Sequence, residues 1–166
     1  LGDEARADAL MLRAVEIGRQ RAAGLAAVDW ALLRLAERRK NVGDIAGAVR
    51  WLEEATEVVD VKSVFALGRE VARMAAQEGG DLTLAGKLYE KLWEREPTAR
   101  EAWQPLADIY QRLGDMEKLE RVVTETLDGL QNAAERNELR VMLAGGLMAI
   151  PGREEEATAV LRDVLN

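Results

Sequence analysis

The sequence predicts an all-α fold made of about four stacked helix–turn–helix repeats, with roughly eight or nine helices in all. Three observations predict it. The composition favours helices, because alanine, leucine, glutamate and arginine dominate and aromatic residues make up only 4%. A Gly-Asp pair recurs along the chain. Apolar residues follow each pair at steps of four and three, which places them on one face of a helix.

The Gly-Asp pairs set the period of the chain. Gly43-Asp44 is followed by Gly80-Asp81 and Gly114-Asp115, of which the last two lie 34 residues apart, and Gly152-Arg153 is a weaker fourth copy. A glycine just past a helix end adopts the left-handed conformation at little cost, and an aspartate after it can cap the next helix. Each pair therefore predicts a turn between a first helix and a second helix.

The second helix of each repeat is expected to bury one face. Five, nine and twelve residues after each glycine the side chains are apolar, apart from one threonine. These positions are Ala48, Leu52 and Ala55; Ala85, Tyr89 and Leu92; Leu119, Val123 and Thr126; and Ala157, Leu161 and Val164.

A first helix with an apolar stripe precedes each glycine. The stripes are Leu32, Leu35 and Ala36; Trp103, Leu106, Ala107, Ile109 and Tyr110; and Val141, Ala144, Gly145 and Met148. Pro97 is expected to end one helix, and Thr98 with Glu101 to form a capping box for the next. Pro105 lies beyond the first turn of its helix and is expected to kink it.

Two stretches, "EAWQPLADIYQRLGDMEKLE" and "GGDLTLAGKLYEKLWEREP", together resemble the tetratricopeptide repeat (TPR). The matching first-helix and turn positions are Trp103, Leu106, Ala107, Tyr110, Gly114 and Asp115, and the matching second-helix and terminal positions are Ala85, Tyr89, Leu92 and Pro97. The resemblance implies a right-handed α–α superhelix. Arginine far outnumbers lysine, which hints at a bacterial source.

We expect residues 1–166 to form a single TPR-like domain. A partial repeat is expected over 1–28, followed by repeats over 29–62, 63–97, 98–133 and 134–166. The segment "GDEARADALMLRAVEIG" fits the second helix of a preceding repeat. Because the sequence opens on Leu1 rather than methionine, we expect it to be part of a longer chain.

The residue inventory argues against an enzyme and against a metal or cofactor site. The sequence has no cysteine, no histidine and one serine, Ser63, which excludes Ser-His, Cys-His and zinc-ligand arrangements. The Gly86-Lys87 pair is not a phosphate-binding loop, because five residues separate Gly80 from Gly86 and no Ser or Thr follows. The acidic run Glu154, Glu155 and Glu156 is the best catalytic candidate, but three acids also suit a helix start.

The charge and hydropathy favour a protein partner in the cytoplasm. The net charge of −7 argues against nucleic acid and against insertion into an anionic membrane. The longest apolar run, Val141 to Ile150, is about half of a membrane span. No signal-peptide pattern is visible, which favours a cytoplasmic location.

In TPR-like arrays the first helix of each pair lines a concave face, and partners bind there. Helical spacing then gives the candidate partner-binding residues Trp30, Leu33, Glu37, Leu67, Glu70, Met74, Glu101, Gln104, Asp108, Gln111 and Arg112, with Leu139, Met142 and Gly146 offered by the last repeat. The apolar members can grip a partner's side chains, and the acidic ones favour some basic charge on that protein or peptide. The alternative is that these residues are ordinary solvated groups and that a flanking helix fills the groove. Gln104, Pro105 and Asp108 have the wrong charge for the chaperone-tail binding known in some TPR modules.

Two further expectations concern the aromatic residues and the last helix. Helical spacing assigns Trp51, Trp93, Trp103, Tyr89 and Tyr110 to the core, with a ligand pocket as the alternative. The segment "EEEATAVLRDVL" ends the sequence with Ala157, Val160, Leu161 and Val164 uncovered. Further repeats or a second copy of the chain would cover them, so a homo-oligomer through the terminal repeats is one alternative function. A helical accessory or regulatory domain of a larger enzyme is the other.

Overall fold

The computed structural model describes residues 2–20, 24–77 and 80–165, and the regular elements in that part are all helical. It contains nine α-helices and one 3-10 helix: α1 (Gly2–Arg19), η1 (Leu25–Val28), α2 (Asp29–Asn41), α3 (Ile45–Ala55), α4 (Val61–Ala75), α5 (Leu82–Arg95), α6 (Arg100–Leu113), α7 (Met116–Gly129), α8 (Ala133–Met148) and α9 (Glu154–Leu165). The predicted all-α class and number of helices are confirmed.

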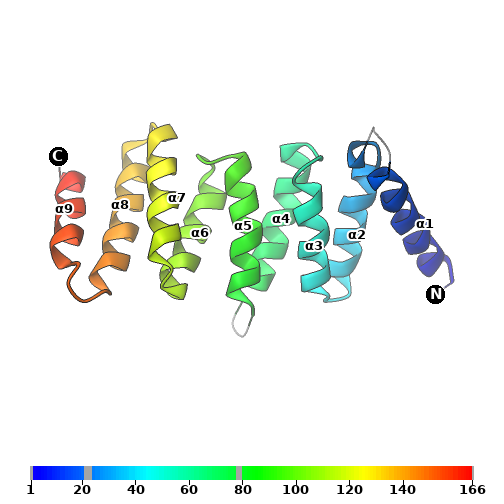
Figure 1. The fold of residues 1–166 in the computed structure, drawn as a ribbon, viewed down its shortest axis with the longest axis horizontal. Coiled ribbons are helices and arrows are strands. Elements are labelled where there is room, and N and C mark those ends of the chain that lie inside the picture. The colour runs from blue at the N-terminus through cyan, green and yellow to red at the C-terminus, as the bar shows by residue number, and fades with distance from the viewer. Residues whose placement is uncertain (1, 21–23, 78–79, 166) are drawn as a thin grey trace. The chain divides into compact units, whose positions relative to one another are not determined.

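The chain divides into two compact bodies, an N-terminal body (Leu1–Arg95) with α1 to α5 and a C-terminal body (Glu96–Asn166) with α6 to α9. Consecutive helices lie side by side within each body (Figure 1). In the N-terminal body α2 packs against α3 and α4, and α3 packs against α4. In the C-terminal body α6 packs against α7 and α8, and α7 packs against α8. The two bodies therefore share one arrangement, in which two first helices flank a second helix and also contact each other.

The turns between paired helices follow the predicted chemistry at three of the four glycines. Gly43, Gly114 and Gly152 have φ values of +80°, +70° and +91°, so each has the left-handed backbone that glycine adopts without strain. The caps of α3, α5 and α7 are aspartates: Asp44 accepts from the Gly47 N–H at 2.9 Å, Asp81 from the Leu84 N–H at 3.0 Å and Asp115 from the Lys118 N–H at 3.2 Å.

At Gly80 the requirement for glycine is steric. A Cβ at Gly80 would clash with the carbonyl oxygen of Ala75 and would lie 2.8 Å from that of Gln77. No side chain therefore fits at this position without a shift of the backbone at the end of α4.

The prediction of a capping box at Thr98 was wrong. The N-cap of α6 is Ala99, and no side chain caps this helix. The reason is register, because α6 begins at Arg100, so Glu101 is its second residue and not the third that a capping box requires. The helix continues through Pro105 to Leu113.

The predicted stripe of the second helices is buried in α3, α5 and α7. All nine predicted positions in these three helices are buried. In α9 the prediction is wrong at Leu161, which is 39% exposed, and Val164 is only half-buried. Of the five aromatic residues assigned to the core, Tyr89, Trp93, Trp103 and Tyr110 are buried. Trp51 is only half-buried, and the guanidinium of Arg19 lies 5.9 Å from its ring centroid.

Helix α8 corrects the predicted buried face of the last repeat. Val141 and Met148 are 50% and 57% exposed, and Gly145 is also exposed, although all three were expected inside. Leu139 and Gly146 were expected to face a partner, yet both are buried, and Met142 is half-buried. Because "VMLAGGLMAI" is apolar on every side, its periodicity does not select a face.

Helix α9 packs against α8 more closely than expected. Ala157, expected to be uncovered, is fully buried in a small core with Ala144 and Leu147. Val160 and Val164 are half-buried, and Leu161 is exposed. The uncovered apolar surface of α9 is therefore smaller than the sequence indicates.

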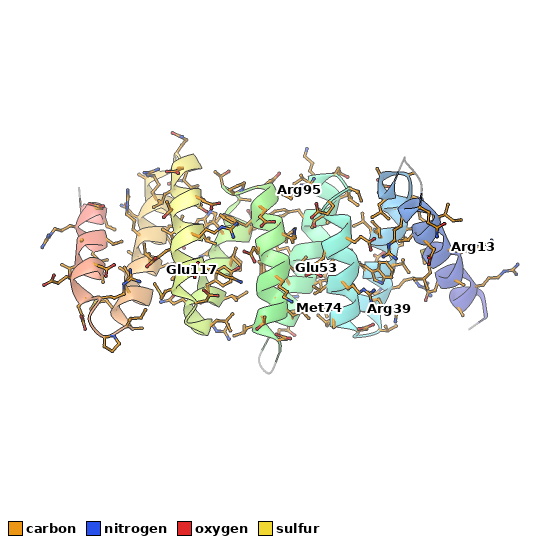
Figure 2. The ribbon with its side chains drawn as sticks, in the orientation of Figure 1. Arg13, Arg39, Glu53, Met74, Arg95 and Glu117 are labelled. Carbon is orange, nitrogen blue, oxygen red and sulfur yellow. The ribbon has the colours of Figure 1, made fainter. Side chains whose placement is uncertain are left out.

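Two arginines from later helices cap the C-terminal ends of the second helices α3 and α7. Arg95, labelled at the upper end of α5 in Figure 2, donates to the carbonyl oxygens of Thr56 and, at 3.1 Å, of Val59. In the C-terminal body Arg136 donates to those of Leu127 at 2.5 Å and Leu130 at 2.9 Å. Each guanidinium satisfies carbonyl groups left without helical partners where α3 and α7 end.

Candidate partner-binding site

The most prominent exposed aromatic side chain in the described part of the chain is Trp30, in the first turn of α2. Its residue is 55% exposed, whereas Trp93 and Trp103 are fully buried. The cause lies in the helix period. The residues that α2 buries are Ala31, Leu32, Leu35 and Ala36. A stripe of that width faces the neighbouring helices and turns Trp30 and Glu37 outward, on the opposite side of α2.

A hollow of about 610 Å³ lies beside Trp30 where α1 meets α2. Its lining consists of Ala7, Leu10 and Met11 from α1 and Trp30, Arg34, Glu37, Arg38 and Asn41 from α2. Leu10 is 63% exposed, so this side of α1 offers a large apolar group to solvent. The two helices run antiparallel here, because Asp8 forms an ion pair with Arg38 at one end and Gly18 approaches Val28 at the other.

A second hollow, of about 330 Å³, lies on the other side of Trp30, toward α4. Trp30, Leu33, Arg34, Glu37 and Leu67 line it. The two hollows share Trp30, Arg34 and Glu37. We call them together the Trp30 groove, with an α1 side and an α4 side.

The charged groups along the groove are matched in pairs. Arg34 Nη1 lies 2.9 Å from Glu37 Oε2, and Arg38 pairs with Asp8. Next to the α4 side, Lys40 Nζ lies 2.9 Å from Glu70 Oε2. The acidic residues here therefore carry less uncompensated charge than the sequence alone indicates, and the apolar side chains dominate the chemistry of the groove.

The structure brings four of the eleven predicted residues together in this groove, namely Trp30, Leu33, Glu37 and Leu67. Glu70 lies beside it in the ion pair with Lys40. Met74, labelled in Figure 2, is half-buried near the end of α4 and does not line either hollow.

The other five predicted residues lie on α6 in the C-terminal body and form polar contacts. Gln104 Nε2 donates to Glu138 Oε1 at 2.7 Å, and Arg100 Nη2 donates to the same carboxylate at 2.7 and 2.9 Å. Asp108 pairs with Arg112 at 3.6 Å. Glu101 is exposed, and Gln111 is half-buried, with its amide close to Gly145. This surface of α6 is polar and has no counterpart of Trp30.

Sequence reasoning missed the α1 contribution to the groove. Ala7, Leu10 and Met11 come from a segment that was expected only to belong to a preceding repeat. The available signal was Leu10, an apolar residue one position before the buried Met11 and therefore off the buried stripe of its helix.

Among the described residues, no three acidic side chains gather closely enough to hold a metal ion, and Glu156 of the acidic run pairs with Arg153. No helix in the described ranges has the length and hydropathy needed to cross a bilayer.

The chain matches no protein-family model and no curated protein. The resemblance to the tetratricopeptide repeat therefore depends on the residues quoted from the sequence, and the function has to be argued from the groove.

Proposed function

We propose that the chain is a TPR-like scaffold that binds a partner protein or peptide on the face formed by its first helices. In this proposal the helix pairs stack as a right-handed superhelix, and the chain has no intrinsic catalysis and no cofactor. The absence of histidine and cysteine from the sequence supports the non-enzymatic part.

Recurring burial supports the repeat architecture. In α3, α5 and α7 the residues five, nine and twelve positions after the turn glycine are all buried. The contacts within each body are also equivalent, since α2 with α4 and α6 with α8 place neighbouring first helices side by side. A helix pair that repeats its buried positions and its neighbours is what a helical solenoid requires.

The exposure of Trp30 between two apolar hollows is the observation that carries the binding function. A solvated tryptophan flanked by exposed Leu10 and half-buried Leu33 and Leu67 leaves a large apolar surface in contact with water. Burial of such surface favours association, and tryptophan is the residue most enriched at the energetic centres of interfaces. The groove is concave on both sides of the ring, so it suits a segment with two apolar anchors.

The charge of the partner is a weaker part of the proposal. Glu37, Glu70 and Asp108 each have a basic neighbour in this chain, and exposed pairs of this kind are weak and screened by salt. A basic partner residue would have to displace Arg34, Lys40 or Arg112. We therefore expect basic charge to add selectivity, while the apolar anchors supply most of the affinity.

A peptide-library selection on the immobilised chain tests the proposal. Binders should carry paired apolar residues, and nuclear magnetic resonance with 15N-labelled chain should show the largest shifts at the Trp30 indole N–H and at α2 and α4. The Trp30→Phe variant identifies that indole signal, since the chain has only four tryptophans. Binders that shift only residues outside the first helices would contradict the proposal.

Self-association through the terminal helices is the second candidate. Leu12 and Ile17 on α1 and Leu161 on α9 are each 39% exposed, so both helices present apolar groups to solvent. Sedimentation velocity over a range of concentrations distinguishes the two functions. A monomer that persists at high concentration would exclude stacking and leave the partner-binding proposal intact.

A further inference from the structure

We propose that the segment of the native protein immediately before Leu1 forms a first helix, and that this helix occupies the α1 side of the Trp30 groove. Helix α1 is then the second helix of that repeat, and Gly2-Asp3 is the turn between the two helices. This inference rests on the repeat architecture of the proposed function, and it restricts the partner to the α4 side of the groove.

A Gly-Asp pair at the start of the chain, Gly2-Asp3, matches the pairs that mark the turns between first and second helices. The leucine before it also matches, because Leu1-Gly2-Asp3 repeats Leu113-Gly114-Asp115. At the later site Leu113 ends α6, and Gly114 has the left-handed backbone that turns the chain into α7. The residues after Gly2 show whether α1 has the register of such a second helix.

The residues that follow Gly2 have the pattern of a second helix. Five, nine and twelve positions after it are Ala7, Met11 and Ala14, in the same small, large and small order as Ala48, Leu52 and Ala55 after Gly43. Met11 is buried, and the two alanines are half-buried. Helix α1 therefore turns the same face inward as α3 does.

Leu10 marks the difference between α1 and the other second helices. It lies eight positions after Gly2, and the equivalent residues of α3, α5 and α7 are Trp51, Leu88 and Val122. Leu88 and Val122 are buried and Trp51 is half-buried, whereas Leu10 is 63% exposed. An apolar side chain at this position is thus covered in three second helices and open to solvent in α1.

A first helix on the preceding side accounts for this difference. Helices α3, α5 and α7 each pack against the first helix that precedes them, whereas α1 packs against α2, the first helix that follows it (Figure 1). The 610 Å³ hollow lies along the junction of α1 and α2 and is lined by Leu10 and Trp30. A preceding first helix in this hollow would contact α1 and α2 in the way that α2 contacts α3 and α4, so it continues an interface that the chain already forms.

A helix in this position changes the partner-binding face. The covered surface of Leu10 and of one side of Trp30 then contributes to the stability of the fold instead of to a complex. The α4 side, where Trp30 lies beside Leu33 and Leu67, stays open. Of the two hollows beside Trp30, the one of about 330 Å³ therefore remains for an apolar side chain of a partner.

The reading frame upstream of residue 1 is the first test. Buried residues lie eleven, eight and seven positions before Gly43 and before Gly114, namely Leu32, Leu35 and Ala36, and Trp103, Leu106 and Ala107. The native sequence should have apolar or small residues at the same distances before Gly2, in a helix of 13 to 16 residues as in α2, α4, α6 and α8. A start codon directly before Leu1, or polar residues at the three positions, would overturn the inference.

Urea unfolding of two chains tests whether the hollow is covered. One chain is residues 1–166, and the other adds one native upstream repeat of about 34 residues. Leu10→Gln should lower the urea midpoint of the longer chain, because it places an amide in a covered apolar contact, and leave that of residues 1–166 nearly unchanged. Leu12→Gln is the matched control, since Leu12 is exposed and does not line the hollow, and it should affect both chains equally. Equal effects of Leu10→Gln on the two chains would contradict the docking of a preceding helix.

Gly2→Ala tests the turn itself. In residues 1–166 helix α1 begins at Gly2, whereas α3, α5 and α7 begin two residues after their glycines. In the longer chain α1 should begin at Glu4, with Gly2 in the left-handed conformation. Gly2→Ala should therefore lower the urea midpoint of the longer chain, where alanine is strained, and not that of residues 1–166, where alanine favours the helix. A longer chain that tolerates Gly2→Ala would show that Gly2 is not a turn.

Peptide binding by the longer chain separates this inference from the proposed function. Affinity for library-selected peptides should fall at least about tenfold with Trp30→Ala and change less than about twofold with Leu10→Gln. A large loss with Leu10→Gln would place the partner on the α1 side, so the helix-docking inference would be wrong and the scaffold function would stand. No loss with Trp30→Ala or Leu67→Gln would remove the proposed function, while the unfolding results would still decide whether a preceding helix covers Leu10.

Discussion

Lys40 Nζ lies 2.9 Å from Glu70 Oε2, and this ion pair joins the first helices α2 and α4 across the N-terminal body. The Lys40 side chain is only 15% exposed, whereas that of Glu70 is 47% exposed. Arg100 and Glu138 form an ion pair between the first helices α6 and α8, although Arg100 is the first residue of α6 whereas Lys40 lies in the last turn of α2. One contact type thus recurs wherever two first helices lie side by side in the described structure.

The Lys40–Glu70 pair should stabilise the chain by about 0.5–1 kcal/mol, near the upper end for surface pairs, because the lysine is largely shielded from water. A double-mutant cycle with Lys40→Met and Glu70→Gln, followed by urea unfolding, measures this coupling energy. The coupling should fall in 1 M salt, where the Debye length is about 3 Å. A coupling energy that is unchanged by salt would mean that packing rather than charge links the two helices.

Adjacent glycines in α8 should respond in opposite ways to substitution. A Cβ at Gly146 would lie 2.8 Å from Leu119 Cδ2 and 2.9 Å from Met116 Sδ, so Gly146→Val should destabilise the chain by about 1–3 kcal/mol through overpacking. A Cβ at Gly145 would approach only the terminal amide of the Gln111 side chain, at 3.0 Å. Gly145→Ala should therefore be neutral or stabilising by up to about 1 kcal/mol, because alanine favours the helix. Equal urea midpoints for the two variants would contradict the close packing of α7 and α8.

The turn glycines should also divide into two kinds. Gly114 has φ +70° and nothing within 4 Å of the position of a Cβ, so Gly114→Asn should cost less than about 1 kcal/mol, since asparagine tolerates this conformation. Gly80→Asn should cost clearly more, because its Cβ would meet the Ala75 carbonyl oxygen. Thermal unfolding of the two variants tests this difference. Equal losses of stability for Gly114→Asn and Gly80→Asn would contradict it.

Sequence periodicity predicted the helices, the second-helix stripe and the aspartate caps because these depend on local spacing and on short-range hydrogen bonds. Asp44, Asp81 and Asp115 all cap as expected. The predictions failed where the outcome depends on a one-residue shift in the start of a helix or on a contact between helices. The capping box predicted at Thr98 does not form, because α6 begins one residue later than that motif requires. The face of α8 was set by the fit of Gly146 against Leu119, which no pattern in an all-apolar run reveals.

The candidate site was predictable only in part for the same reason. Trp30, Leu33, Glu37 and Leu67 share one groove as projected from the helical period. Leu10 and Met11 of α1 line the site because α1 packs antiparallel to α2. Helical spacing within one segment does not predict such a contact between helices. The pairing of Glu37 with Arg34 and of Glu70 with Lys40 likewise depends on side-chain positions that a sequence does not specify.

Tyr89 should make the stability of the chain fall at alkaline pH. Burial raises the pKa of the Tyr89 hydroxyl above its ordinary value of 10.0, while Arg69 and Arg73 lower it to a smaller extent. A raised pKa in the folded state means that the stabilisation is fully present below about pH 10 and is lost as the pH rises through the folded value. Urea unfolding of the wild type should therefore weaken more between about pH 10 and 12 than that of Tyr89→Phe. Parallel pH profiles for the two proteins would show that Tyr89 ionises freely in the folded state.

The affinity of library-selected peptides for Trp30→Ala tests the partner-binding groove most directly. Trp30 is 55% exposed, so its removal should leave the fold intact, and Val141→Ala in the C-terminal body is a matched control at 50% exposure. Isothermal titration calorimetry should give at least about a tenfold loss of affinity for Trp30→Ala and less than about a twofold change for Val141→Ala. Unchanged affinity for Trp30→Ala would show that the groove is not where this chain holds a partner.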